Sequence, residues 1–323
     1  MSKTRLISLL FGLVILFWVF QSVGLAQVLI SIKKLGWRTL ILAPFFIIPT
    51  TMASLAWRSL FTIGKKPAFT RIFFATWVGL ACNWLLPVAQ IGGELVKARL
   101  LSRPELDAEP WSTMVLDKTF QVITQIFFTM LGLGILMRYP VGATFWWASA
   151  FGLLILSVIG TVLICVQRWG FFLISAKLLQ PLFKHSKPGH MLKVAKSIDN
   201  QVILLHEKPW PLVQAFSWRL GFRFCMAGEI YLIMFLMGSP VTVGEAIVLE
   251  SLGQAVRMMA FFIPAGLGAQ EGALALIGAS LGLPSISCLA LSIARRMREL
   301  MVGLPGLVAL WGSQVASPAK VTR

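Results

Sequence analysis

The stretch NWLLPVAQIGGELVKARLL, residues 83–101, interrupts an apolar segment with a proline, two adjacent glycines and a glutamate. A backbone exposed to lipid does not tolerate such an interruption, because each unpaired amide group in hydrocarbon costs several kcal/mol. The proline ends one helix, the glycines let the chain turn, and a new helix is expected to start near Glu94. Residues 72–100 are therefore predicted to form a broken helical hairpin.

A second copy of this pattern lies further along the chain. PAGLGAQE at residues 264–271 matches PVAQIGGE at 87–94, because both run from a proline to a glutamate over eight residues, with glycine between. Each glutamate is followed 24 residues later by a cation, in the pairs Glu94–Lys118 and Glu271–Arg295. The offset of 177 residues predicts an internal duplication whose break residues are Pro87, Gly92, Gly93, Pro264, Gly266 and Gly268. The alternative is a pair of proline kinks at tight packing corners.

The composition predicts an all-α polytopic membrane protein. Of the 323 residues 57% are hydrophobic and 13% are charged, and the mean hydropathy is +0.82, whereas a soluble domain carries about 25% charge. Several apolar runs are long enough for a hydrocarbon core of about 30 Å. The predicted full spans are residues 6–30, 39–57, 113–137, 143–166, 210–237 and 286–312. The broken hairpins at 72–100 and 245–282 either enter part-way or cross twice, one in each half of a single transmembrane domain (6–166 and 210–312).

The net charge of +17 follows the rule that cytoplasmic loops of membrane proteins accumulate lysine and arginine. It does not require a nucleic-acid partner. With the N-terminus inside, 18 of the 29 basic residues, Lys97 among them, fall on the cytoplasmic side and four fall outside. Both termini are therefore predicted to be cytoplasmic, although the basic loop KKLGWR at residues 33–38 is then external. Three full crossings separate the two hairpins, so the halves are predicted to form an inverted repeat.

Residues 168–209 are too polar to span a membrane. Within them, apolar residues recur at helical spacing opposite Lys193, Lys196 and Asn200. This pattern predicts a basic amphipathic helix on the cytoplasmic leaflet, or a connecting helix packed on the bundle, and the two are compatible.

Thirteen ionisable residues fall within the predicted spans and hairpins. A lone charge at mid-bilayer costs about 2.5–3.5 kcal/mol or more, so these groups should pair or face a wet cavity. The cations are Lys118, Arg219, Arg223, Arg257, Arg295, Arg296 and Arg298, and the acids are Glu94, Asp117, Glu229, Glu250, Glu271 and Glu299.

Some of these residues are assigned to a substrate cavity or pathway: Glu94, Glu271, Arg257, Arg295, Arg296, Arg298 and Glu299. Arg295 and Arg298 are expected to attract a phosphate or another anionic head group, while the glutamates balance their charge. Glu94 and Glu271 could instead stabilise the first turns of their own helices through the helix dipole. Asp117 and Lys118 lie near the end of a span and are expected to reach water.

No metal or cofactor site is predicted. The cysteines Cys82, Cys165, Cys225 and Cys288 are scattered singly through apolar segments, and no Cys/His spacing suggests a metal ligand set. No nucleotide-binding loop is present in the sequence.

At these motifs the sequence resembles the flippase-like transmembrane region of lysylphosphatidylglycerol synthases, and most closely its hopanoid-biosynthesis-associated branch. The resemblance covers roughly residues 6–312, with an alanine in PAGLG where many relatives have glycine. The family's motif positions correspond to Pro87, Gly92, Gly93, Glu94, Pro264, Gly266, Gly268, Glu271, Arg295, Arg296 and Glu299.

The resemblance implies a multi-pass protein of the bacterial inner membrane whose partners are membrane lipids, such as hopanoids or anionic phospholipids. Only about eleven residues follow the last predicted span, so the soluble aminoacyl-transferring domain of full-length synthases is not expected here. The leading prediction is a non-enzymatic lipid transporter or flippase with a central charged cavity. The alternatives are a non-catalytic partner of lipid-biosynthesis enzymes, docked through residues 168–209, and a lipid-modifying membrane enzyme.

Overall fold

The computed structural model describes residues 36–62, 66–86, 92–102, 109–140, 142–168, 188–259 and 269–316. Every regular element in these ranges is helical, which confirms the all-α prediction. The first predicted span, residues 6–30, lies outside the described residues. The elements are η1 (Gly36–Ile41), α3 (Leu42–Phe45), α4 (Ile47–Ser59), α5 (Phe69–Leu85), α6 (Gly92–Leu101), α7 (Glu109–Leu136), α8 (Ala143–Arg168), α10 (Pro188–His206), α11 (Pro209–Leu236), α12 (Val243–Met259), α13 (Ala269–Ser280) and α14 (Ser285–Ala316).

The helices repeat with the offset that the motifs indicate. α6 begins at Gly92 and α13 begins at Ala269, 177 residues later. α4 ends at Ser59 and α11 ends at Leu236, which is also 177 residues later. The helices α4, α5, α6 and α7 thus correspond in order to the end of α11 and to α12, α13 and α14.

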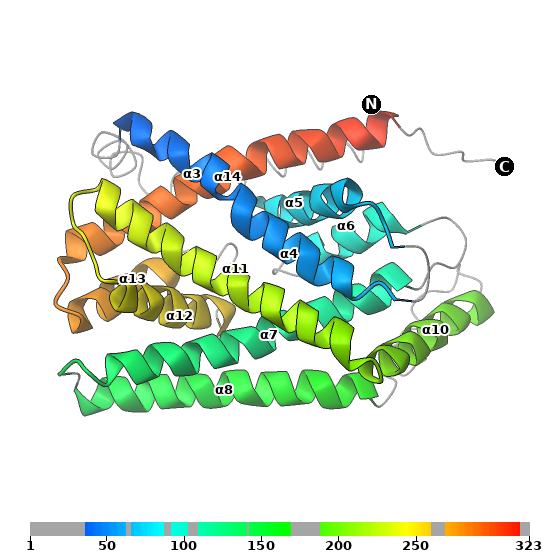
Figure 1. Cartoon of the computed structure of the whole chain (residues 1–323), viewed down its shortest axis with the longest axis horizontal. Coiled ribbons are helices and arrows are strands. Elements are labelled where there is room, and N and C mark those ends of the chain that lie inside the picture. Colours follow the sequence, from blue (N-terminus) through cyan, green and yellow to red (C-terminus); the bar gives the residue numbers. More distant parts are fainter. Residues whose placement is uncertain are drawn as a thin grey trace.

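The two sets of helices interlock. α4 and α11 lie side by side and run antiparallel (Figure 1). At one end, Arg38 of η1, which precedes α4 in the chain, donates to the carbonyl of Leu236 at the end of α11. At the other end, Ser59 of α4 donates to the carbonyl of Pro211 near the start of α11. α14 packs on α5, and in the same way α7 packs on α12. The largest apolar core forms around α11, α12, α13 and α14 and includes Leu42, Ile230, Leu249, Leu274 and Leu291.

The described surface is strongly apolar, whereas charge is concentrated inside. α8 lies along α7 at the edge of the bundle (Figure 1) and exposes Trp147, Phe151, Leu154, Val158 and Val162 in a stripe at helical spacing. Large exposed apolar areas mark surfaces that contact protein or lipid. Buried charge behind such a surface is the arrangement expected of a membrane-embedded bundle.

The number of spans stays a prediction. Two described helical runs, Gly36–Ser59 and Glu109–Leu136, are both long and apolar enough to cross a membrane, and α8 contains the shorter apolar run Ser149–Val162. α11 and α14 have 28 and 32 residues, so their length is sufficient, but they carry three and four charged side chains. Those charges are buried within the bundle.

α10 is the helix that the structure describes within the polar segment 168–209. Its residues Ile198 and Val202 are buried against Leu60, Leu116 and Ala215 of the bundle. Lys196 and Asn200 are exposed. The helix is therefore amphipathic and packs on the bundle through its apolar face.

Candidate functional site

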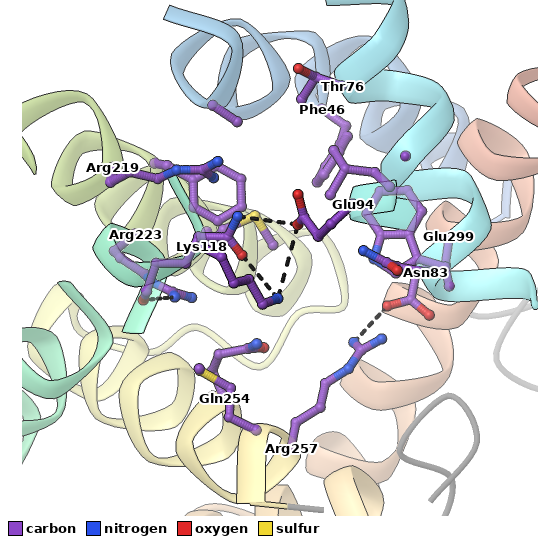
Figure 2. A pocket seen from close by; sticks show the side chains of 18 of the residues that line it. Phe46, Thr76, Asn83, Glu94, Lys118, Arg219, Arg223, Gln254, Arg257 and Glu299 are labelled. Atoms are coloured by element: carbon purple, nitrogen blue, oxygen red, sulfur yellow. Dashed lines mark hydrogen bonds and ion pairs between the residues drawn. The ribbon is translucent and has the colours of Figure 1, made fainter. Parts of the chain in front are cut away.

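A cavity of about 120 Å³ lies among α4, α5, α6, α7, α11, α12 and α14 (Figure 2). Since a water molecule occupies about 30 Å³ in the liquid, this space suits a few waters or a small polar group. It is too small for a whole lipid. Ten of its lining residues are charged, namely Glu94, Lys97, Lys118, Arg219, Arg223, Glu250, Arg257, Arg295, Arg298 and Glu299.

Glu94 enters the cavity because α6 presses closely on α5. A Cβ atom at Gly93 would lie 2.0 Å from the carbonyl oxygen of Gly79, so only glycine fits at this crossing. The amide N–H of Gly93 donates to Oδ1 of Asn83 at 2.9 Å, which satisfies one of the open donors at the start of α6. The GlyGly–Glu motif therefore places Glu94 in the first turn of a helix held against α5.

The first ion-pair network joins α6, α7 and α11. Nζ of Lys97 lies 2.7 Å from Oε2 of Glu94 and 2.7 Å from Oδ2 of Asp117. Nε of Arg219 donates to Oδ1 of Asp117 at 2.8 Å, and its Nη2 pairs with the second carboxylate oxygen. Lys118 lies 3.9 Å from Glu94.

One expectation about this region is wrong. Asp117 was expected to reach water, but it is fully buried, and two cations pair with it inside the bundle. Lys97 was counted among the cations of the cytoplasmic side, an assignment that stays a prediction; it lies within α6 and is buried between two carboxylates. The side chain of Lys118 does retain about 30% exposure.

A second network joins α11, α12 and α14. Arg298 donates to both carboxylate oxygens of Glu229, at 2.7 and 3.1 Å. Arg295 pairs with Glu250 at 2.8 Å. The guanidinium of Arg298 also lies 4.3 Å from the ring centroid of Phe46 and 4.9 Å from that of Trp84, a geometry that favours cation–π attraction.

A third network extends to α13. Nη1 of Arg257 donates to Glu299 at 2.7 Å and to Gln270 at 2.9 Å. Arg296 pairs with Glu299 at 3.1 Å and with Glu271 at 3.2 Å. Glu94 and Glu271, which correspond in the two halves, thus each lie in the first turn of a helix and each pair with a cation.

Arg223 differs from the other buried arginines. It is 5% exposed and donates from Nη2 to the backbone carbonyl of Gln121 at 2.9 Å. Within the described part of the chain no carboxylate lies in ion-pair distance of it, and its Nε has no hydrogen-bond partner. Oγ1 of Thr76 and Nη1 of Arg298, on two other lining residues, also have no hydrogen-bond partner. The same is true of Oε2 of Glu94, Oε2 of Glu250 and Nε of Arg295, but these three atoms lie in ion-pair distance of oppositely charged groups. Unsatisfied buried donors of this kind call for a water or ligand partner.

The cavity carries an excess of positive charge. Seven of its lining residues are cationic and three are carboxylates, and Asp117 and Glu229 behind the wall bring the carboxylates to five. Among the described residues this leaves two unbalanced positive charges. Figure 2 shows Lys118 and Arg223 on one side of the space and Glu94 and Glu299 on the other.

Five of the seven predicted pathway residues line the cavity, and the other two lie beside it. Glu94, Arg257, Arg295, Arg298 and Glu299 line the cavity, whereas Arg296 and Glu271 form the adjoining pair. The hypothesis that Arg295 and Arg298 attract an anion stays a prediction. Their carboxylate partners already oppose most of their charge, so Arg223 has the stronger requirement for an anion.

Several break residues fall outside the described residues: Pro87, Pro264, Gly266 and Gly268. Gly92 is the first residue of α6. The helices on both sides of each break are in place, whereas the choice between a part-way entry and two crossings stays open.

The sequence pattern did not single out Lys97, Asn83 or Thr76 as cavity residues. Lys97 follows Glu94 by three residues, a spacing that puts both on one helix face and could have indicated the pair. Within the described ranges no group of three or more His, Cys, Asp or Glu side chains could hold a metal ion.

The comparisons with known proteins agree with the helical architecture. The family model described as the lysylphosphatidylglycerol synthase transmembrane region matches residues 5–306 of the chain. Neither the search of curated proteins nor that of solved structures gave a match. Because the match covers nearly all of the sequence, including every helix that contributes to the charged cavity, the chain belongs to the lysylphosphatidylglycerol synthase transmembrane-region family, a family of membrane domains.

Proposed function

We propose that this membrane protein moves a polar lipid between the leaflets of the bacterial inner membrane through its charged cavity. An apolar exterior around a polar, charged interior supports this proposal, because lipid tails can stay outside while a head group enters the bundle. The head group of a lipid crosses hydrocarbon only at high cost, so a path lined by charges lowers the barrier.

The proposed topology has two inverted halves, about six full spans and two broken hairpins, with both termini cytoplasmic. The inversion is supported by the antiparallel packing of α4 on α11, because α4 corresponds to the end of α11. It is also supported by the packing of helices across the halves, since α5 packs on α14 and the corresponding helix α12 packs on α7. In transporters built from such repeats, the substrate site lies near the midplane between interrupted helices. The cavity lies beside the first turn of α6, and the glutamate in the first turn of α13 pairs with Arg296 next to it.

Arg223 is the observation that carries the choice of substrate. Among the described residues no carboxylate lies within ion-pair distance of its buried guanidinium, and Glu250 attracts it only from further away. Burying a charge without a close partner is costly. A phosphate oxygen would accept hydrogen bonds from Arg223 and would offset the excess positive charge of the lining. The proposal therefore favours a lipid with an anionic, phosphate-bearing head group over a hopanoid precursor that has no anionic group.

Leaflet exchange in liposomes tests the proposal. Purified protein is reconstituted, and the exchange of fluorescent phosphatidylglycerol is followed by chemical quenching of the outer leaflet. Fluorescent phosphatidylcholine, which has no net charge, serves as the comparison lipid. We expect faster exchange of phosphatidylglycerol and a decrease of about tenfold in Arg223→Gln, since hydrogen bonds to a charged group contribute about 1.5–3 kcal/mol.

Arg138→Gln is the matched control, because Arg138 is an exposed arginine in the turn between α7 and α8. It should exchange lipid at the wild-type rate. A wild-type rate in correctly folded Arg223→Gln would refute the role of Arg223. If the wild-type protein showed no exchange but supported the activity of a co-reconstituted biosynthetic enzyme, the scaffold alternative would replace transport. Formation of a modified lipid would indicate an enzyme.

A further inference from the structure

A second hollow lies beside the charged cavity, on the far side of Phe46. It is an apolar groove of about 550 Å³, formed by α3, α4, α5 and α14. Its walls include Pro44, Ile47, Trp77 and Pro305. Pockets of about 300–1,000 Å³ hold small organic ligands, so this groove is large enough for a hydrocarbon chain, whereas the charged cavity is not.

Phe46 contributes to the walls of both spaces. Its ring is 1% exposed, lies edge-on to Trp84 with 5.1 Å between ring centroids, and contacts the guanidinium of Arg298. One aromatic ring therefore separates a region of paired charges from a region without charged side chains in its described lining.

The same helices line both spaces in sequence-adjacent positions. On α14, Arg298 lies at the cavity and Val302, one turn later, lies at the groove. On α5, Thr76 lies at the cavity and its neighbour Trp77 lies at the groove, where its indole N–H donates to the carbonyl of Val302 at 2.9 Å. The two spaces are thus adjoining parts of one region between α4, α5 and α14.

We infer that the groove holds the hydrocarbon chain of the same lipid whose anionic head group enters the charged cavity, with Phe46 as the partition between them. This inference rests on the proposed function. Moving a chain from the bilayer into an apolar groove gains little free energy, because both surroundings are apolar. Retention of the chain must therefore depend on the head group, and through it on Arg223.

Photolabelling from the lipid chain tests this inference. Phosphatidylglycerol with a diazirine in its acyl chain is incorporated into nanodiscs with the protein, irradiated, and the labelled peptides are mapped by mass spectrometry. We expect labels on the peptides that contain Trp77 and Val302. Labelling should fall about tenfold in Val302→Trp, which fills the groove, and by a similar factor in Arg223→Gln, which weakens the head-group site.

Val308→Trp is the control, because Val308 is exposed on the same helix but lines neither space. It should label as the wild type does. The map of the wild-type protein needs no variant, so a folding defect in one of them does not decide the result. Absence of label from both peptides in the wild type, as expected if another segment of the chain covers the groove, would overturn the inference. Equal labelling in Arg223→Gln would also overturn it, because bulk lipid would then be the occupant.

The leaflet-exchange assay separates this inference from the proposed function. Groove labelling that depends on Arg223 but comes without any lipid exchange would support the two-part site and reject transport. Exchange that depends on Arg223, without label in the groove, would support transport and reject the two-part site.

Discussion

Replacing Glu229 by glutamine should destabilise the protein strongly. Glu229 is fully buried and accepts two hydrogen bonds from Arg298, and Nε of Arg295 lies 3.6 Å from its second oxygen. In glutamine one of the two acceptor oxygens is replaced by an NH2 group, which would face an N–H donor of an arginine. Glu250 would then be the remaining carboxylate for both Arg295 and Arg298. Breaking a buried ion pair by removing one partner costs about 3–5 kcal/mol. We therefore expect a loss of this size for Glu229→Gln.

The measurement is thermal unfolding in detergent, followed by the loss of the monodisperse peak in size-exclusion chromatography. The unfolding entropy is about 2.1 cal/mol/K per residue, so for 323 residues a change of 1 kcal/mol shifts the melting temperature by about 1.5 °C. The variant should therefore melt about 4–8 °C lower. The double variant Glu229→Leu with Arg298→Met removes both charges and should recover much of this loss, because Arg295 keeps Glu250 at 2.8 Å. Destabilisation in the double variant equal to the sum of the single effects would refute the account of a compensated pair.

Two further perturbations can be read in the same assay. Gly93→Ala should lower the melting temperature by several degrees, because its Cβ would lie 2.0 Å from the carbonyl oxygen of Gly79. Gly272→Ala in α13 is the control, and it should be neutral or stabilising because nothing lies within 4 Å of the added atom. Equal melting temperatures of the two variants would contradict the close crossing of α5 and α6. Lys97→Gln should destabilise by about 3 kcal/mol, since it leaves Glu94 with only the more distant Lys118, at 3.9 Å, as an ion-pair partner in the described region. Exposed Lys66→Gln is its control, and similar melting of the two would show that Lys97 makes no structural contribution.

Features written into the local sequence were predictable. Proline, glycine and glutamate at matched positions indicated where α6 and α13 begin, because the conformational limits of these residues act within a few positions of the chain. The periodic apolar residues of α10 indicated which of its faces is buried, and Ile198 and Val202 are buried accordingly.

The choice of ion-pair partners was not predictable in this way. Glu229 and Arg298 are 69 residues apart, and Asp117 and Arg219 are 102 apart. Their contacts depend on how α11 packs against α7 and α14, which helical periodicity does not determine. Lys97 was counted only as a cation of the cytoplasmic side, because charge counting follows the linear order of spans, whereas its burial depends on Asp117 of the next helix. The lack of an ion-pair partner for Arg223 among the described residues likewise depends on how the whole bundle packs.

The charge-paired interior has a consequence for biogenesis. Glu229 of α11 leaves the ribosome well before its partners Arg295 and Arg298 of α14 exist, whereas Arg219 of the same helix finds Asp117 of α7 already made. An isolated α11 would bring an uncompensated carboxylate into hydrocarbon, at a cost of about 2.5–3.5 kcal/mol on insertion scales. Stable membrane integration of α11 should therefore wait for α14. A truncated nascent chain that ends before residue 285 should remain associated with the insertion machinery, and a full-length chain should be released into lipid.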